Sequence, residues 1–146
     1  DFTIYANKSF QDLTAKITGS LSLVLTAIAG ISLFVGGIGI MNIMLVSVKE
    51  RTKEIGLRKA IGATQKAILT QFLVEAIIVS VVGGAIGTGI GVSGILLISI
   101  FSPVPASVPL GAIILATGVS GSIGLIFGVI PAKQAAQLDP ITALRN

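Results

Sequence analysis

The sequence has 146 residues, of which 53% are apolar and only 11% are charged, and its net charge is +4. Soluble domains carry about 25% charged residues, so the composition favours a membrane protein. Histidine and cysteine are absent, which excludes Ser-His-Asp and Cys-His nucleophiles, thiol redox centres and ordinary zinc sites. The six acidic residues are too scattered for a carboxylate metal site. We therefore expect no catalytic residue, metal or cofactor in this chain.

The N-terminal segment, residues 1–19, combines two patterns. Asp1–Ala6 alternates loosely between apolar and polar residues, which predicts the last strand of an outer domain. From Ser9 onward the apolar residues recur every three or four positions, which predicts a helix that runs on to Val48. Such a helix is about 60 Å long, about twice the thickness of the hydrocarbon layer. We favour a rigid stalk that carries motion to the membrane; the alternative is a helix lying on the outer leaflet.

Two long stretches contain no charged residue: Ile17–Val48, with 32 residues, and Ala76–Ala132, with 57 residues. A membrane-spanning helix needs about 20 apolar residues, so the first stretch holds one span and the second holds two. Three prolines in Phe101–Pro109 divide the second stretch, because proline interrupts a helix. The predicted fold is therefore an all-α membrane domain over residues 20–130, with spans near 20–46, 76–98 and 110–130.

The basic residues predict how these spans are oriented. Six of them lie in the loop between the first two spans, residues 49–66, whereas the proline-rich loop has none. The positive-inside rule then places this loop and the tail, residues 131–146, in the cytoplasm and the N-terminus outside. An exported N-terminus without an initiator Met or signal peptide predicts that an earlier span and an outer domain precede Asp1. A nucleic-acid partner is not expected, because the basic residues lack interleaved aromatic residues.

The loop of residues 49–66 is the first candidate functional segment. Its charges alternate in sign, and a small-residue turn at Gly62-Ala63-Thr64 precedes another helix, for which Thr64 is a suitable N-cap. The apolar face predicted for that helix contains Ile68, Leu69, Phe72, Leu73 and Ala76. Two interpretations stay open: a solvated loop followed by an interfacial helix, or a short helix presented to a cytoplasmic partner.

Glu75 is the acidic residue nearest the membrane. Ala76–Phe101 alone provides about 39 Å of helix, so we place Glu75 at the inner interface. An ionisable residue inside the bilayer would be a candidate functional site. The alternative function is accordingly an ion-coupled secondary transporter or small channel that uses Glu75, and a third is a structural anchor for an outer domain.

Regularly spaced glycines predict close helix packing. Gly83, Gly87 and Gly91 recur every four residues, as do Gly124 and Gly128. Small residues at this spacing let helices approach closely, within the chain or against a second copy. The alternative is the general excess of glycine in membrane helices. In the tail, Asp139-Pro140 fits an N-cap followed by proline at the first helical position.

Three segments resemble the FtsX/MacB family of ABC-transporter permeases, and most closely its macrolide-exporter MacB branch. They are the Glu-Arg-x-x-Glu-Ile-Gly-x-Arg pattern of Val48–Ala63, Phe72-Leu-Val-Glu75 before the glycine-rich helix, and the Pro-Ala…Asp-Pro…Ala-Leu-Arg ending of Pro131–Arg145. The resemblance covers residues 20–146. It implies a four-span permease of the bacterial cytoplasmic (inner) membrane, whose first span and outer domain are missing here.

The resemblance also implies partners and a function. Members act as dimers with an ABC ATPase, which is fused or separate. ATP and Mg are expected to bind to that ATPase, because this chain has no phosphate loop. A periplasmic or extracellular adaptor is a further expected partner. The implied function is efflux of macrolides or antimicrobial peptides, in which ATP-driven motion passes to the outer domain. The matching ATPase-coupling residues are Glu50, Arg51, Glu54, Ile55, Gly56, Leu57, Arg58, Lys59, Ile61, Gly62 and Ala63. Among them, Glu54, Arg58 and Lys59 would supply polar contacts, and Ile55, Leu57 and Ile61 apolar ones.

Overall fold

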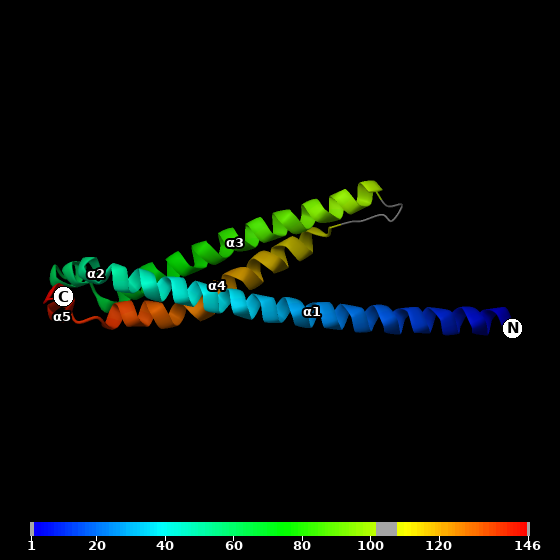
Figure 1. Cartoon of the computed structure of the whole chain (residues 1–146), viewed down its shortest axis with the longest axis horizontal. Coiled ribbons are helices and arrows are strands. Elements are labelled where there is room, and N and C mark those ends of the chain that lie inside the picture. The colour runs from blue at the N-terminus through cyan, green and yellow to red at the C-terminus, as the bar shows by residue number, and fades with distance from the viewer. Residues whose placement is uncertain (1, 102–107, 146) are drawn as a thin grey trace. The chain divides into compact units, whose positions relative to one another are not determined.

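The chain is all-α, as predicted. The computed structural model describes residues 2–101 and 108–145, and in that part of the chain every regular element is a helix (Figure 1). The helices are α1 (Phe2–Glu50), α2 (Thr52–Ala60), α3 (Gln65–Phe101), α4 (Leu110–Gln137) and α5 (Pro140–Arg145). Most of the proline-rich segment predicted to divide the second apolar stretch lies outside the described residues. α3 ends at Phe101 and α4 begins at Leu110, on either side of that segment.

Helix α1 corrects one prediction at the N-terminus. Residues Phe2–Ala6 are helical, so the predicted strand is wrong. The alternation covers only six residues, and extending an existing helix adds one hydrogen bond for each residue fixed. Contacts divide the chain into two units, Asp1–Gly36 and Gly37–Asn146, and the described residues of the first unit all belong to α1. The packing described below lies within the second unit.

Three helices are long and apolar enough to cross a membrane. They are residues Lys8–Glu50 of α1, α3 and α4, with lengths of 43, 37 and 28 residues. Their large apolar side chains are mostly exposed in the single chain, which suits contact with lipid. Hydroxyl groups on these helices are satisfied locally: Thr26 donates to the carbonyl of Ser22, and Ser122 to that of Gly118. Such bonds meet the requirement that polar groups in lipid find internal partners. The chain is a multi-pass membrane protein.

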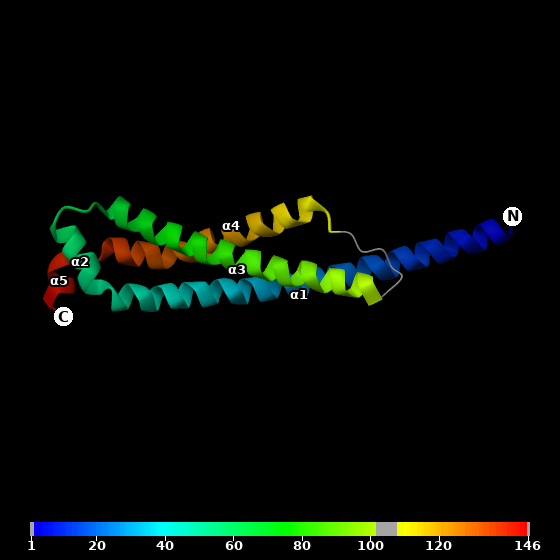
Figure 2. The same cartoon turned by 90° about the horizontal axis from the view of Figure 1, so that it is seen from above.

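Helices α3 and α4 lie side by side (Figures 1 and 2), and small residues bring them together. A Cβ atom added to Gly124 would lie 2.5 Å from the Cβ of Ser80 and 2.8 Å from the carbonyl oxygen of Ala76. Nearby, Ser80 donates a hydrogen bond to the carbonyl of Ser120, and the Ser120 hydroxyl donates to the carbonyl of Ser80 at 2.6 Å. We call this contact, made by Ala76, Ser80, Ser120, Gly124 and their neighbours, the α3–α4 seam.

The buried core lies at the end of the bundle where α2 and α5 are found (Figure 2). It combines side chains from four helices: Met44, Val48, Ile55, Ile68, Phe72, Ala76, Ala132, Ala135 and Ala136. The predicted apolar face of the segment after Thr64 is confirmed, because Ile68, Phe72 and Ala76 are buried and Leu69 and Leu73 pack against them. This segment is not a separate interfacial helix, since α3 continues unbroken from Gln65 into the apolar stretch. Likewise, α4 continues through the buried Pro131 to Gln137.

Candidate functional site

The candidate site is built on α2, the short helix between the first two apolar helices. Glu54 lies in its first turn and Arg58 and Lys59 in its last, an arrangement that complements the helix dipole. The helix ends at Ala60, and Gly62, two residues later, has a φ of 108°, the left-handed conformation that glycine adopts without strain. The amide of Ala63 donates to the carbonyl of Arg58 at 2.9 Å, which closes the helix end as in a Schellman motif. The loop therefore contains a helix.

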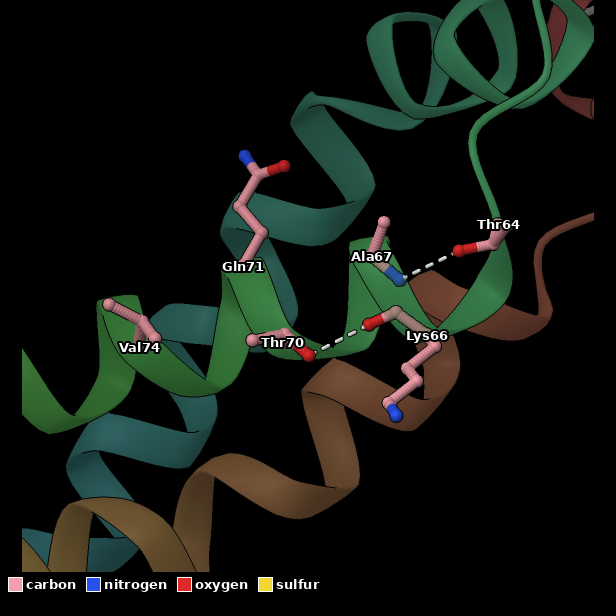
Figure 3. A pocket seen from close by; sticks show the side chains of 6 residues that line it. All are labelled: Thr64, Lys66, Ala67, Thr70, Gln71 and Val74. Atoms are coloured by element: carbon pink, nitrogen blue, oxygen red, sulfur yellow. Dashed lines mark hydrogen bonds between the residues drawn. The ribbon is translucent and has the colours of Figure 1, made fainter.

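The next helix starts with the predicted N-cap. The Thr64 hydroxyl accepts a hydrogen bond from the amide of Ala67 at 3.2 Å (Figure 3). Along the exposed side of α3, Thr70 donates to the carbonyl of Lys66 and belongs with Thr64 and Val74 to a shallow pocket. Hydroxyl and aliphatic groups dominate this pocket, and no acidic residue lines it. It therefore offers an accessible surface on α3.

Arg51, between α1 and α2, connects three helices. Its Nε donates to Glu54 Oε2 at 3.1 Å and its Nη2 to Glu54 Oε1 at 3.2 Å, so α2 is held by two parallel bonds. Its Nη1 donates to Glu75 Oε2 of α3 at 3.2 Å. The guanidinium carbon also lies 5.5 Å from the centre of the Phe72 ring, within the range of a cation–π contact. A single side chain thus joins the α1–α2 junction to α2 and α3.

Glu54 and Arg58 extend this arrangement. Arg58 pairs with Glu54 at 2.6 Å and donates to Gln71 Oε1 of α3 at 3.1 Å. The hydrogen bond from Arg51 lowers the pKa of Glu54 below its ordinary value, with the positive charges of Arg51 and Arg58 acting in the same direction. The bond to Glu54 likewise raises the pKa of Arg51. Both shifts favour the charged forms of Glu54 and Arg51.

Lys59 and Gly56 attach α2 to the C-terminal part of the chain. The Nζ of Lys59 donates to the carbonyls of Ala136, at 2.8 Å, and Leu138, which are at the end of α4. Gly56 is covered by α5, because an added Cβ would lie 2.6 Å from the Cβ of Ala143. The predicted cap of α5 is confirmed, since the Asp139 carboxylate accepts from the Thr142 hydroxyl at 3.0 Å and from the Ile141 amide. The end of α4 and α5 therefore support α2.

The outer face of α2 is apolar and exposed. Lys53, Leu57 and Ile61 are spaced four residues apart and share one face of the helix. Leu57 is 56% exposed and Ile61 is 79% exposed, and Lys53 is also exposed. Leu57 and Ile61 lie outside the predicted membrane spans, so water rather than lipid would surround them in an isolated chain. We call Lys53, Leu57, Ala60 and Ile61 the outer face of α2.

The predicted coupling residues thus separate into three groups. Leu57 and Ile61 are on the outer face, and Glu50 at the end of α1 is also exposed. Ile55, predicted as an apolar contact for the ATPase, is fully buried and packs into the core instead, because its position faces the other helices. The remaining residues have partners within the chain or shape the ends of α2: Arg51, Glu54, Gly56, Arg58, Lys59, Gly62 and Ala63.

The glycines separate similarly. Gly124 and Gly128 lie in the α3–α4 seam, where an added Cβ would approach Ser80 or Ala76 at 2.5 Å. Gly83, Gly87 and Gly91 have open space around them in the single chain, so their packing stays a prediction about a second copy. Sequence reasoning missed Gly84, which approaches Ser120, and Gly37 of α1, which approaches the Phe127 ring. The spacing of small residues four positions apart, such as Ser80 and Gly84, was the sequence signal that could have indicated the close approach at Gly84.

Glu75 lies at the α2 end of α3, in the ion pair with Arg51. Its side chain is 39% exposed, so it is a partly solvated acid with a structural partner. Its location at the inner membrane interface stays a prediction. An ion-binding role would require Glu75 to exchange Arg51 for the transported ion.

Comparison with known proteins identifies the family. A family model described as the FtsX-like permease C-terminal domain matches residues 26–140. The chain belongs to this family. The match includes α2, α3 and α4, so the outer face of α2 and the charged network are part of the permease domain.

The relatives of this FtsX-like permease include transporters with several names. It is 53% identical over 144 residues to the macrolide export ATP-binding/permease protein MacB of Bdellovibrio bacteriovorus, covering 99% of this chain and 22% of that protein. It is 51% identical over 130 residues to the uncharacterized ABC transporter permease YknZ of Bacillus subtilis, covering 89% of this chain and 33% of that protein. It is 49% identical over 148 residues to the pyoverdine export ATP-binding/permease protein PvdT of Pseudomonas fluorescens, covering 100% of this chain and 22% of that protein. The chain thus spans between about a fifth and a third of these relatives.

Proposed function

We propose that this chain is the membrane part of an ABC-type exporter and transmits ATP-driven motion from a cytoplasmic ATPase to an extracytoplasmic domain. The ATPase is a separate subunit or a fused domain, and ATP and Mg bind there. A second copy of the permease completes the transporter, and an extracytoplasmic adaptor is a further partner. The names of two relatives support export of a macrolide-like or pyoverdine-like compound.

The observation that carries this proposal is the exposed outer face of α2. A short helix with Ile55 buried on one side and Leu57 and Ile61 exposed on the other is suited to bind a partner. Apolar side chains surrounded by charges form the usual centre of a protein–protein contact. Lys53, four residues before Leu57 on the same face, is exposed and provides a positive charge at the rim. We assign this face to the ATPase and place the α2 end of the bundle in the cytoplasm, in agreement with the basic residues around it.

Helix α1 supports the transmission role. It is continuous from Phe2 to Glu50, and its end joins α2 through Arg51 alone. Displacement of α2 therefore acts directly on a helix long enough to cross the membrane and extend beyond it. We propose that the part of α1 before Gly19 is the stalk that leads to the outer domain.

Substitutions on the outer face test the proposal. In the complete transporter, reconstituted in nanodiscs with its ATPase, Leu57→Ser and Ile61→Ser should each lower permease-dependent ATP hydrolysis about tenfold, because removal of a central apolar contact weakens docking. Val74→Ser is the matched control, since Val74 is 47% exposed but lies on α3. Unchanged hydrolysis in both α2 variants would contradict the docking assignment.

A further inference from the structure

We propose that Arg51 is a positioning residue, through which movement of α2 is passed to α3. The inference rests on the proposed function and deepens it. It concerns how movement of α2 is passed to α3, whereas the outer face concerns how the ATPase moves α2. The residues of the coupling segment then divide by role: the apolar Leu57 and Ile61 bind the ATPase, and the charged Arg51 and its partners hold the helix in place.

The geometry around Arg51 supports this role. Arg51 follows the last residue of α1 and precedes the first residue of α2, so any rotation of α2 relative to α1 pivots close to it. From this point its Nη1 reaches Glu75 on α3, across 24 positions in the sequence. Its other two nitrogens hold Glu54 of α2. The planar guanidinium therefore fixes the two carboxylates at a set separation.

The surroundings of the network distinguish it from a simple surface ion pair. The Arg51 side chain is only 30% exposed, and Phe72, on whose ring it lies, is fully buried. A second connection between the same helices joins Arg58 of α2 to Gln71 of α3 at 3.1 Å. Glu75 and Gln71 are four residues apart, so both connections reach the same face of α3. Two polar contacts and one buried ring thus make α2 and α3 move together.

Arg51 has a specific chemical advantage over lysine. Lysine carries one ammonium group and is a point charge, whereas the guanidinium presents several donors in one plane. Here the Nε and Nη2 donors serve one acid and Nη1 serves the other. Glu54 also accepts from Arg58 at 2.6 Å, so the two arginines balance the two acids. Loss of either Arg51 or Glu75 would remove this ion pair and leave the Arg58–Gln71 contact and the packing of Ile55 in the core to hold α2 against α3.

The experiment separates transmission from docking. The sequence has no cysteine, so a single introduced cysteine can be labelled once any cysteine elsewhere in the complete transporter has been removed. An environment-sensitive dye attached at Thr70→Cys reports changes in the surroundings of the exposed side of α3. A second cysteine at Ala60→Cys reports docking by cross-linking to the ATPase. On addition of MgATP with vanadate, the dye signal of the otherwise wild-type protein should change. Arg51→Gln and Glu75→Gln should each reduce that change about tenfold, with cross-linking preserved.

A double-mutant cycle decides whether the two residues act together. The double variant should show no greater loss than either single variant, because both remove the same connection. Lys66→Gln, an exposed charge on α3, is the control and should leave the signal unchanged. A full dye response in Glu75→Gln, or losses that multiply in the double variant, would overturn the inference; Glu75→Gln serves alone if Arg51→Gln fails to fold. Failure of the proposed function would give a different result. Cross-linking and the ATP-dependent signal would then be absent even in the protein that carries only the reporter cysteines, with Arg51 and Glu75 unchanged.

Discussion

The α3–α4 seam and the attachment of α2 hold helices together by opposite means. In the seam, small residues allow the backbones to approach, and the hydroxyls of Ser80 and Ser120 each bond to the other's carbonyl. In the attachment, long charged side chains reach between helices, and Arg51, Glu54 and Arg58 remain 30–42% exposed. Ala76, Ser80, Ser120 and Gly124 of the seam carry no titratable side chain, whereas the attachment depends on five: Arg51, Glu54, Arg58, Lys59 and Glu75.

This difference reflects the surroundings of each region. Within lipid, apolar surfaces gain nothing by leaving the solvent, so helices associate through close packing and internally satisfied polar groups. Near water, ion pairs can exchange with solvent, and each contributes little by itself. The seam is therefore suited to keep α3 and α4 as one rigid pair. The attachment is suited to hold α2 firmly and still permit adjustment when a partner binds.

Gly124→Ala should have the largest effect, because it forces the seam apart. The new methyl group would approach Ser80 and the carbonyl of Ala76, and neither can move without separating the helices. Overpacking of this kind costs about 1–3 kcal/mol. We expect a lower free energy of unfolding in detergent micelles, measured by circular dichroism, and partial loss of monodisperse protein.

Gly118→Ala is the control for this experiment. Gly118 is in the same helix, but an added Cβ meets nothing within 4 Å, so the substitution should be neutral or stabilising by about 0.5–1 kcal/mol. Equal effects of the two substitutions would show that the seam does not depend on close approach at Gly124.

Lys59→Met should have a smaller effect, confined to the attachment. It removes the donors to the carbonyls of Ala136 and Leu138 at the end of α4. Because Lys59 is half-buried, we expect a loss of about 1 kcal/mol. Hydrogen exchange followed by mass spectrometry should show faster exchange in α5 and the last turn of α4, with the α3–α4 seam unchanged.

Lys53→Met is the matched variant, since Lys53 lies on the same helix but is exposed on its outer face. Its exchange pattern in α5 should match the wild type. If both lysine variants loosen α5 equally, a general loss of positive charge, and not the contact with α4, is the cause.

The sequence predicted the membrane helices well because their signal is strong. Charge-free stretches, the N-cap at Thr64 and the apolar face containing Ile68 and Phe72 all depend on local spacing, and the structure confirms the cap and this face. The strand predicted at Asp1–Ala6 was wrong, because Phe2–Ala6 is helical and a six-residue alternation is a weak signal beside an adjoining helix. Short patterns are outweighed by the cooperativity of a long helix.

The candidate site was less accessible to sequence reasoning. The pattern around Glu54 and Lys59 indicates a candidate segment, but which side chains face inward depends on the direction in which α2 leaves α1. That direction is set by long-range contacts, such as Lys59 with Ala136 and Arg51 with Glu75. Ile55 and Leu57 are only two residues apart, yet one is fully buried and the other is exposed. Composition and spacing alone do not distinguish them.

Acidification should produce the smallest effect, and only in the attachment. The pKa of Glu54 is lowered, chiefly by the hydrogen bond from Arg51. A carboxyl with a lowered pKa in the folded state contributes stability above its unfolded pKa, and this contribution is lost as the pH falls through the folded pKa. The hold of α2 should therefore be constant from neutral pH to near 4.5, the ordinary value for Glu54, and weaken below it.

Fluorescence anisotropy compares the two regions directly. A dye at Ala60→Cys on α2 should lose anisotropy as the pH falls below 4.5, whereas a dye at Ser122→Cys on α4 should not, because Ala76, Ser80, Ser120 and Gly124 of the seam carry no titratable side chain. Glu54→Gln provides the control, since its α2 dye should be more mobile already at neutral pH and respond less to acid. If the α2 dye responds to acid equally with and without Glu54, another carboxyl controls the attachment, and Glu75 is then the group to substitute next.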